Sequence, residues 1–308
     1  MTSLVDHPSN EFVKLLLIGP SKSGKTGSLA SLVKAGYKLR ILDFDNLLDI
    51  LKHVIQKECL EMIDNVEFVS LRDRYKHGSG GVVLEGKPKA WDTALRLCDH
   101  WKYTDTTGKE IDLGVPAQWG RDCVLVIDSL SRLCDAAYNW HELMIPRGRG
   151  GDFDGRAVYR NAQQAVEKFI ALLTSDTMAV NVIVTAHVVY QEQSLGIVKG
   201  FPQGIGQKLS PKIPTYFSST VLYTNVGGKR TIQTNCTPLM DLANPRPFDM
   251  QPEYSIDTGL AQFFAQLVAR PQSKALPKPQ PQPQAQEETQ EKTPLPLTHP
   301  RSLTLRKV

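Results

Sequence analysis

The residues with the clearest chemical meaning form the run Gly19-Pro-Ser-Lys-Ser-Gly-Lys-Thr26, which fits G-x-x-x-x-G-K-[ST] at every position. Glycines in such a run let backbone N–H groups converge on phosphate oxygens. On this pattern Lys25 reaches the β- and γ-phosphates of a nucleotide, and the Thr26 hydroxyl binds Mg²⁺. The expected phosphate-binding residues are Gly19, Pro20, Ser21, Lys22, Ser23, Gly24, Lys25, Thr26 and Gly27.

The segments on both sides of this run are the ones that its chemistry requires. Residues 12–18 are mostly apolar and predict a short buried strand. Residues 27–34 place Leu29, Leu32 and Val33 on one face and predict a helix, whose N-terminal dipole end favours phosphate. A chance match in a segment rich in Gly, Ser and Lys is the alternative, and the two flanks argue against it.

Carboxylates end two other apolar runs. Residues 123–128 predict a buried parallel strand that delivers Asp128 at its carboxyl end. Downstream of a phosphate loop, such an acid belongs to the Mg²⁺ coordination shell, whereas an acid in an ordinary strand-end turn is the alternative. Residues 37–45 predict a strand that ends in Asp43 and Asp45. Two strands joined through a helix indicate a parallel sheet with right-handed crossovers.

The remaining pattern predicts an α/β fold, with a mainly parallel central sheet flanked by helices and a C-terminal antiparallel hairpin. Residues 144–155 and 191–217 are rich in glycine and predict long loops. Further elements are expected as helices at residues 46–59, 90–103, 130–143, 156–173 and 257–270, as strands at 66–69 and 180–187, and as a hairpin over 219–234 that turns on Gly227-Gly228.

Two segments stand apart from this alternation of strands and helices. Residues 72–120 predict an insertion with one helix and a small hairpin. We expect Trp91 and Trp101 to pack that helix, the alternative being exposed rings that stack on bases. We assign residues 1–270 to one domain and residues 271–308, which are rich in Pro, Gln and Glu, to a disordered tail.

The composition limits the classes of function. The 308 residues are 41% hydrophobic and 22% charged, as in ordinary globular proteins. No apolar run is long enough for a transmembrane helix, and residues 1–10 lack the pattern of a signal peptide. Five cysteines without a C-x-x-C pair indicate a reducing, cytoplasmic environment rather than disulfides or a zinc site. A net charge of +4 is too small to indicate a nucleic-acid partner by itself.

The order of these features resembles the ATPase core of the RecA recombinase family, over about residues 12–250. More closely, it resembles the phage-encoded minimal RecA-core ATPases, some of which anneal or pair single-stranded DNA. Ile127-Asp128-Ser129 is similar to the family's Walker B strand and its following serine. The resemblance implies a RecA-like P-loop NTPase fold, ATP hydrolysis, and ATP and Mg²⁺ as cofactors, with Thr26 and Asp128 as the Mg²⁺-binding residues.

The same resemblance implies roles in the chemistry. Asp45 falls where the family carries a glutamate that activates the attacking water, and its shorter side chain leaves Asp43 as the alternative base. Thr185-Ala-His187 occupies the place of a polar γ-phosphate sensor, although a histidine that merely ends a strand is the alternative. The implied catalytic residues are Lys25, Asp45, Asp128 and His187.

Residues 146–155 and 192–217 correspond in this resemblance to two DNA-contacting loops. Their cations can neutralise phosphates and release counterions, and Phe201 is expected to wedge or stack a base. Lids that close over a phosphorylated metabolite are the alternative. The implied DNA-binding residues are Arg147, Arg149, Lys199, Lys208 and Lys212.

Lys229 and Arg230 lie where the family places cations that reach across a filament interface, so a trans finger is expected, with a plain surface turn as the alternative. The implied partners are single-stranded DNA, further copies of this chain and, through the tail, a replication or single-strand-binding protein. The resemblance thus implies a DNA-dependent ATPase of phage recombination or replication. A nucleotide-switched replication or assembly accessory factor and, less favoured, a P-loop small-molecule kinase are the alternatives.

Overall fold

The computed structural model describes residues 11–145, 154–193 and 196–268. Within these ranges the core is an eight-stranded sheet of order β14-β13-β12-β1-β9-β8-β2-β3. Its strands are β1 (Lys14–Ile18), β2 (Lys38–Asp43), β3 (Val66–Ser70), β8 (Gly120–Asp128), β9 (Val180–Ala186), β12 (Ser219–Val226), β13 (Lys229–Gln233) and β14 (Glu253–Ser255). Every pairing from β12 to β3 is parallel, and the pairings of β13 with β12 and with β14 are antiparallel. The predicted mainly parallel α/β fold is confirmed.

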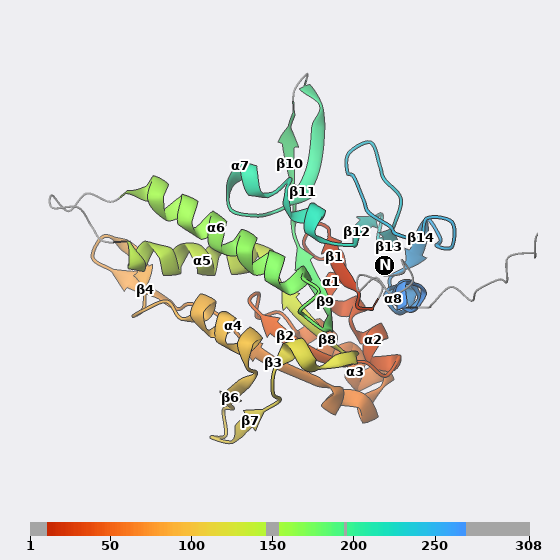
Figure 1. Cartoon of the computed structure of the whole chain (residues 1–308), viewed down its shortest axis with the longest axis horizontal. Helices are drawn as coiled ribbons and strands as arrows, with labels where there is room; N and C mark the ends of the chain where they lie inside the picture. Colours follow the sequence, from red (N-terminus) through yellow and green to blue (C-terminus); the bar gives the residue numbers. More distant parts are fainter. Residues whose placement is uncertain (1–10, 146–153, 194–195, 269–308) are drawn as a thin grey trace, which may run out of the picture. The chain divides into compact units, whose positions relative to one another are not determined.

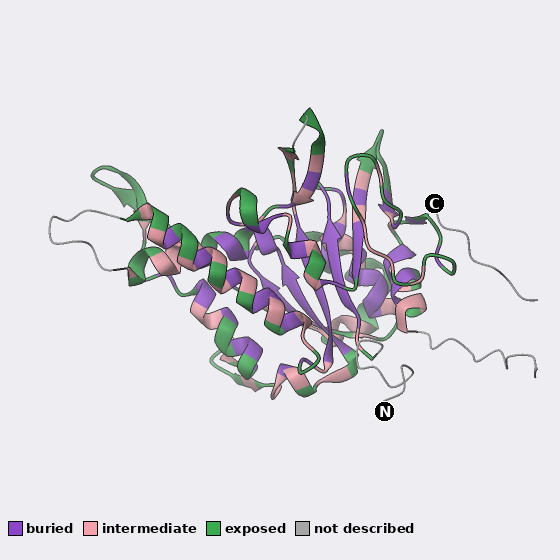
Figure 2. Ribbon diagram, turned by 45° about the horizontal axis from the view of Figure 1, so that its top comes forward, coloured by how far each residue is buried: buried purple, intermediate pink, exposed green. Residues whose placement is uncertain are grey.

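Helices cover both faces of this sheet (Figure 1). One face packs against α4 (Ala90–Asp99), α5 (Leu130–Met144) and α6 (Gly155–Thr174). The other packs against α2 (Ala30–Lys34), α3 (Asp49–Glu58) and α8 (Gly259–Val268). The central strands β1 and β9 are buried at every position between these two layers (Figure 2). No helix in the described ranges is long and apolar enough to cross a membrane.

Strand β1 shows why its sequence is apolar at every position. Leu15 and Leu17 pack into the core on the α2 and α8 side, whereas Leu16 and Ile18 pack into the core on the α5 and α6 side. Successive side chains of a strand point to opposite faces, so a strand covered on both faces needs an unbroken apolar run. Strands β8 and β9 alternate in the same way. Because β1, β8 and β9 run parallel, their carboxyl ends lie at one edge of the sheet.

The insertion contains more structure than the sequence predicted. One hairpin was expected, but two flank α4: β4 (Tyr75–Gly78) with β5 (Gly81–Leu84), and β6 (Lys102–Thr104) with β7 (Glu110–Asp112). Helix α4 ends at Asp99 rather than near residue 103, because the chain turns back there to bury Trp101 against Trp119, at a ring distance of 5.4 Å. Trp91 packs against Phe169, so packing roles for both tryptophans are confirmed.

The prediction of one long loop over residues 191–217 is wrong in part. The chain forms an antiparallel hairpin of β10 (Val188–Glu192) and β11 (Val198–Pro202), then the short helix α7 (Gly206–Leu209) and a 3₁₀ turn at Ile213–Tyr216. Cross-strand pairing stabilises this hairpin, and glycine-rich composition alone did not reveal it. The predicted C-terminal hairpin is confirmed as β12 and β13, with both glycines of its turn at positive φ.

Candidate functional site

The phosphate loop connects β1 to α1 (Lys25–Ser28), and two of its glycines have no room for a side chain. Gly24 has φ 100°, and a Cβ there would lie 3.0 Å from Ile256. A Cβ on Gly19 would lie 2.6 Å from the Tyr223 carbonyl oxygen. The first N–H groups of α1 have no acceptor inside the helix, so the loop presents donors at the edge of the sheet.

Lys25 is buried against this loop. Its ammonium donates to the carbonyl oxygens of Gly19 at 2.8 Å and Pro20 at 2.9 Å. Burial lowers the pKa of Lys25 to about 8, although the carboxylates of Asp128 and Asp45 oppose this shift. A buried cation held by two neutral carbonyl groups would gain a stronger acceptor from a phosphate group.

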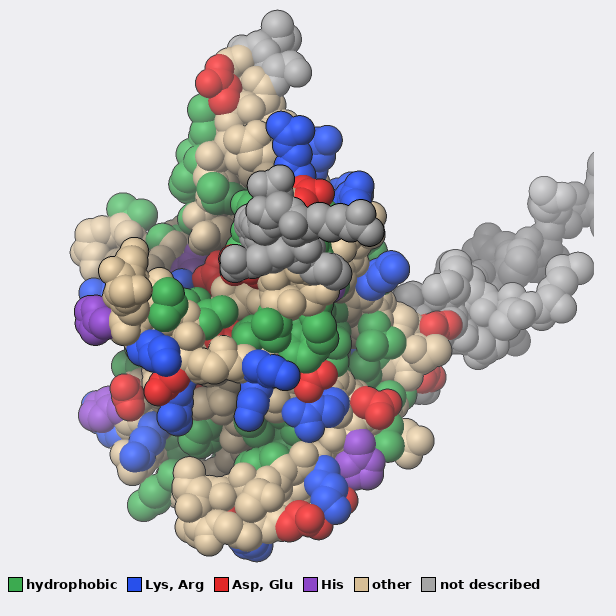
Figure 3. Space-filling view, turned by 90° about the vertical axis from the view of Figure 1, so that its left-hand side faces the viewer, with side chains coloured by type: hydrophobic (Ala, Val, Ile, Leu, Met, Phe, Trp, Pro, Cys, Tyr) green, Lys and Arg blue, Asp and Glu red, His purple; other side chains and the backbone are tan. Residues whose placement is uncertain are grey.

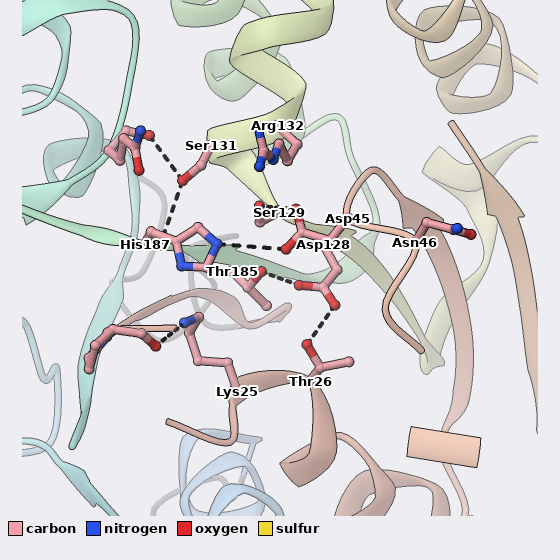
Figure 4. A network of polar contacts seen from close by, with 12 residues as sticks. Lys25, Thr26, Asp45, Asn46, Asp128, Ser129, Ser131, Arg132, Thr185 and His187 are labelled. Carbon is pink, nitrogen blue, oxygen red and sulfur yellow. Dashed lines mark hydrogen bonds and ion pairs between the residues drawn. The ribbon is translucent and has the colours of Figure 1, made fainter. Parts of the chain in front are cut away.

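Asp128 lies at the carboxyl end of β8 and is nearly inaccessible to solvent. The Thr26 hydroxyl donates to its Oδ2 at 2.8 Å, and the Thr185 hydroxyl donates to its Oδ1 (Figure 4). Burial raises the pKa of Asp128, and the nearby charge of Asp45 raises it further, whereas the two hydroxyl groups and Lys25 oppose the rise. Strands β8 and β9 and the phosphate loop therefore meet at this carboxylate.

Asp45 lies just beyond the end of β2, on the other side of Asp128 from Thr26 (Figure 4). The Ser129 hydroxyl donates to its Oδ1 at 2.8 Å, and His187 Nε2 lies 3.7 Å from its Oδ2. Burial by itself would raise the pKa of Asp45, but the contacts with His187 and Ser129 and the charge of Arg132 outweigh burial and lower it. The carboxylate is thus held ionised, as an acceptor of protons requires.

Asp43 points elsewhere. It accepts the Asn46 backbone N–H at 2.7 Å and the Ser70 hydroxyl at 3.3 Å. Burial raises the pKa of Asp43 to about 6, against these hydrogen bonds. Of the two acids that end this strand, the structure therefore places Asp45 beside His187 and Ser129, and Asp43 against β3.

The residues at this edge suit a magnesium nucleotide. Thr26 and Asp128 offer a hydroxyl and a carboxylate, the oxygen ligands that Mg²⁺ uses. The described ranges hold no cluster of three or more His, Cys, Asp or Glu that could bind a metal, and Mg²⁺ ordinarily completes its shell with water and phosphate oxygens. The buried Ser23 hydroxyl has no hydrogen-bond partner in the described chain, which leaves an unsatisfied polar atom inside the loop.

The five residues predicted to bind DNA differ in their surroundings. Arg147 and Arg149 lie outside the described residues. Lys199 pairs with Asp241 at 2.6 Å and Lys212 pairs with Glu167 at 3.1 Å, so both cations are partly neutralised. Lys208 is exposed and forms no ion pair with any described residue. Phe201 is partly buried in β11, opposite Val189.

Of the two residues expected as a trans finger, Arg230 lies close to the phosphate loop of its own chain. Lys229 pairs with Glu253 at 3.1 Å across the β13–β14 ladder. Arg230 Cδ lies 3.5 Å from the position that a Cβ on Gly24 would take. Sequence reasoning did not foresee this approach within one chain, because Gly24 and Arg230 are far apart in the sequence and only the order β13-β12-β1 of the sheet brings them together.

Two further contacts were missed by the sequence argument. Ser131 Oγ accepts the His187 backbone N–H at 3.2 Å and lies 3.5 Å from the Gln203 carbonyl oxygen. The Gln203 N–H in turn donates to the His187 carbonyl oxygen at 2.8 Å. The signal available in the sequence was the pair of serines that follows Asp128 after the strand.

The chain was compared with known protein families and structures. Residues 11–242 match the model of the AAA domain family. Among solved structures, the RadB recombinase is similar at 14% identity and a TM-score of 0.42, over 81% of this chain and 90% of that chain. A prototypical ATPase from the type III secretion system of pathogenic bacteria is similar at 12% identity and a TM-score of 0.38, over 70% of this chain and 52% of that chain. No curated protein sequence matches the chain.

Proposed function

The chain belongs to the AAA domain family and has the fold of a RecA-like P-loop ATPase, and from that premise we propose a Mg²⁺-dependent ATPase that binds single-stranded DNA. We propose further that it promotes annealing or strand pairing in phage DNA recombination or replication. ATP binding would set the position of the DNA-facing segments, and hydrolysis would release them.

The hydrolytic part of the proposal assigns a task to each residue at the sheet edge. Lys25 offsets the charge of the β- and γ-phosphates, and Thr26 with Asp128 holds Mg²⁺. Bound Mg²⁺ supplies positive charge that stabilises the phosphate oxygens during transfer. Asp45 accepts the proton of the attacking water, while Ser129 and His187 keep its carboxylate ionised and oriented.

One observation supports a coupling between ATP and DNA: His187, which lies beside Asp45, also hydrogen-bonds to the end of a projecting hairpin. His187 directly precedes β10, and its carbonyl oxygen accepts the N–H of Gln203, just after β11. The hairpin of these two strands stands out from the sheet (Figure 1). A change at the γ-phosphate that moves His187 would therefore reach the hairpin through a direct hydrogen bond.

The remaining parts of the proposal rest on the sequence resemblance. They are assembly into a homo-oligomer in which Lys229 and Arg230 act on a neighbouring ATP site, DNA contacts by Arg147, Arg149, Lys199, Lys208 and Lys212, and recruitment of a replication or single-strand-binding protein by residues 271–308.

The test is the ATPase rate with and without single-stranded DNA, together with DNA binding at several salt concentrations. We expect DNA to raise the rate, and its affinity to fall as salt increases, because phosphate contacts release counterions. Lys25→Ala is the control that removes the ATP site but not the DNA-facing segments. An unchanged rate together with no salt-sensitive binding would contradict the proposal. Negative-stain electron microscopy of the same samples reports on assembly.

A further inference from the structure

A pocket of about 740 Å³ lies between α5 and α6, away from the phosphate loop. The residues that matter to it are Tyr138, Asp154, Arg156, Tyr159, Arg160 and Gln163. Its volume falls within the range of ordinary ligand sites. The hydrolytic mechanism above uses none of these side chains, so the pocket has no role yet.

Two tyrosines form one wall of the α5–α6 pocket. Tyr138 and Tyr159 meet edge to face, with ring centroids 5.6 Å apart and an interplanar angle of 71°. Tyr159 remains 46% exposed, so much of its ring is open to a ligand. Aromatic faces that solvent can reach are the platforms on which proteins stack unpaired bases.

Two arginines supply the charge. Arg156 and Arg160 lie one helical turn apart on α6, and both are exposed. Neither forms an ion pair with any residue in the described ranges. Like charges at this spacing repel each other, which an anionic ligand would relieve. Asp154 is the opposing charge, but its carboxylate caps α6 by accepting the Ala157 N–H at 3.0 Å.

The pocket also adjoins the segment that leads back to the ATP site. A Cβ on Gly206 would lie 3.1 Å from the Tyr159 ring, and Gln163 Nε2 donates to the Ile205 carbonyl oxygen at 2.6 Å. The Gln203 N–H donates to the His187 carbonyl oxygen only a few residues away. Tyr159 therefore contacts residues 203–206, the segment that is hydrogen-bonded to His187.

We propose that the α5–α6 pocket holds one unstacked base of single-stranded DNA on Tyr159, with the neighbouring phosphates on Arg156 and Arg160. The inference rests on the proposed function and names where that DNA is read by stacking. An unpaired base offers a ring, and its flanking phosphates offer two anions, which matches one aromatic wall beside two guanidinium groups that form no ion pair with a described residue. Lys and Arg side chains lie among Asp and Glu side chains on the face shown in Figure 3, so the phosphate contacts are assigned to the two arginines rather than to a uniformly basic surface.

The test compares two fluorescein-labelled probes of equal length, an oligothymidylate and an abasic oligonucleotide that keeps the phosphates. Tyr159→Ala is expected to weaken oligothymidylate binding about 5- to 150-fold, the loss typical of one stacked base. It should leave affinity for the abasic probe within about twofold, because phosphate contacts do not require the ring. Tyr159→Phe keeps the ring and should bind as the unaltered protein does.

The double variant Arg156→Ala/Arg160→Ala tests the phosphate contacts. It should weaken both probes and reduce the slope of log affinity against log salt by about 1.4, for two phosphates of a single strand. Lys168→Ala is the matched control, since Lys168 is an exposed cation of the same helix outside the pocket. The control should change the affinity for the two probes and the salt slope much less than the double arginine variant does.

The outcomes separate this inference from the proposed function. If the unaltered protein binds oligothymidylate but folded Tyr159→Ala and the double arginine variant bind it equally well, the pocket is not a DNA site and the proposed function stands. Equal losses of Tyr159→Ala on both probes overturn base stacking. If the unaltered protein binds neither probe, both proposals fail together. Since all three altered side chains are exposed, circular dichroism is expected to show a folded protein in each case.

Discussion

Replacing Asp45 with asparagine is the sharpest test of the hydrolytic mechanism. The amide side chain would keep the shape of the carboxylate and could still accept the Ser129 hydroxyl, which now lies 2.8 Å from the carboxylate. It would lose the negative charge that faces His187 Nε2 at 3.7 Å and could no longer take a proton from water. The change therefore removes the proposed base without emptying its site.

The expected magnitude follows from these contacts. A positioned general base contributes about 10²- to 10⁴-fold to a rate, so ATP hydrolysis should fall by that factor. Lys25 donates to two carbonyl oxygens of the phosphate loop and Thr26 donates to the Asp128 carboxylate, and none of these groups hydrogen-bonds to the Asp45 side chain. Asp128 meets Asp45 only through the backbone, where its carbonyl oxygen accepts the Asp45 N–H at 3.2 Å. Nucleotide affinity should consequently stay the same or rise slightly, because a negative charge near the phosphates is gone.

The assay is single-turnover hydrolysis beside nucleotide binding measured by fluorescence, with Asp43→Asn as the matched control on the same strand. The two acids also differ in pH dependence. Burial raises the pKa of Asp43 to about 6, whereas the contacts of Asp45 lower its pKa. If Asp45 is the base, the acid limb of the rate profile is the same in Asp43→Asn as in the unaltered protein. Near-normal hydrolysis by Asp45→Asn, or a large loss in Asp43→Asn alone, refutes the reasoning.

Three other changes have defined outcomes. Lys25→Met should abolish the rise in melting temperature that Mg²⁺-ATP produces, while the nucleotide-free protein melts no lower, because burial lowers the pKa of Lys25 to about 8 and its charge is costly at neutral pH. The pKa of Asp43 is raised to about 6, so the stability contributed by its proton is present below about pH 4 and lost as the pH rises through 6. Urea unfolding should therefore show that the free energy of unfolding of Asp43→Asn, relative to that of the unaltered protein, is higher at about pH 7.5 than at about pH 4.5. The same relative free energy at both pH values would contradict this sign. Trp101→Ala should lower the free energy of unfolding by about 3–5 kcal/mol, because the ring is fully buried against Trp119. A loss below about 1 kcal/mol in urea titrations would mean that the cavity closes.

The phosphate loop was readable from the sequence because its chemistry lies within one continuous run. Backbone donors, Lys25 and Thr26 need only the strand before them and the helix after them. The strands themselves were readable for a similar reason, since burial on both faces demands apolar residues at every position. The C-terminal hairpin followed from the two glycines of its turn.

Other features depend on elements that are distant in the chain. The hairpin of β10 and β11 requires pairing of two segments whose composition reads as loop, and the second hairpin of the insertion requires the buried turn at Trp101. The ion pairs of Lys199 and Lys212 depend on acids far away in sequence. Local sequence patterns do not reveal such partners, because the periodicity of a helix or strand shows which face a side chain lies on but not which distant residue contacts it.

The sequence by itself determined that a phosphate-binding loop and several strand-end acids exist, since spacing and apolar runs are local properties. Only the tertiary structure decided which of the two acids of the β2 end faces the proposed ATP site. Asp43 and Asp45 end the same strand, yet one is held by Asn46 and Ser70 and the other by Ser129 and His187. Asn46 is a local partner, whereas Ser70 ends β3, Ser129 follows β8 and His187 follows β9. The order β9-β8-β2-β3 of the sheet is what brings these three residues to their acids.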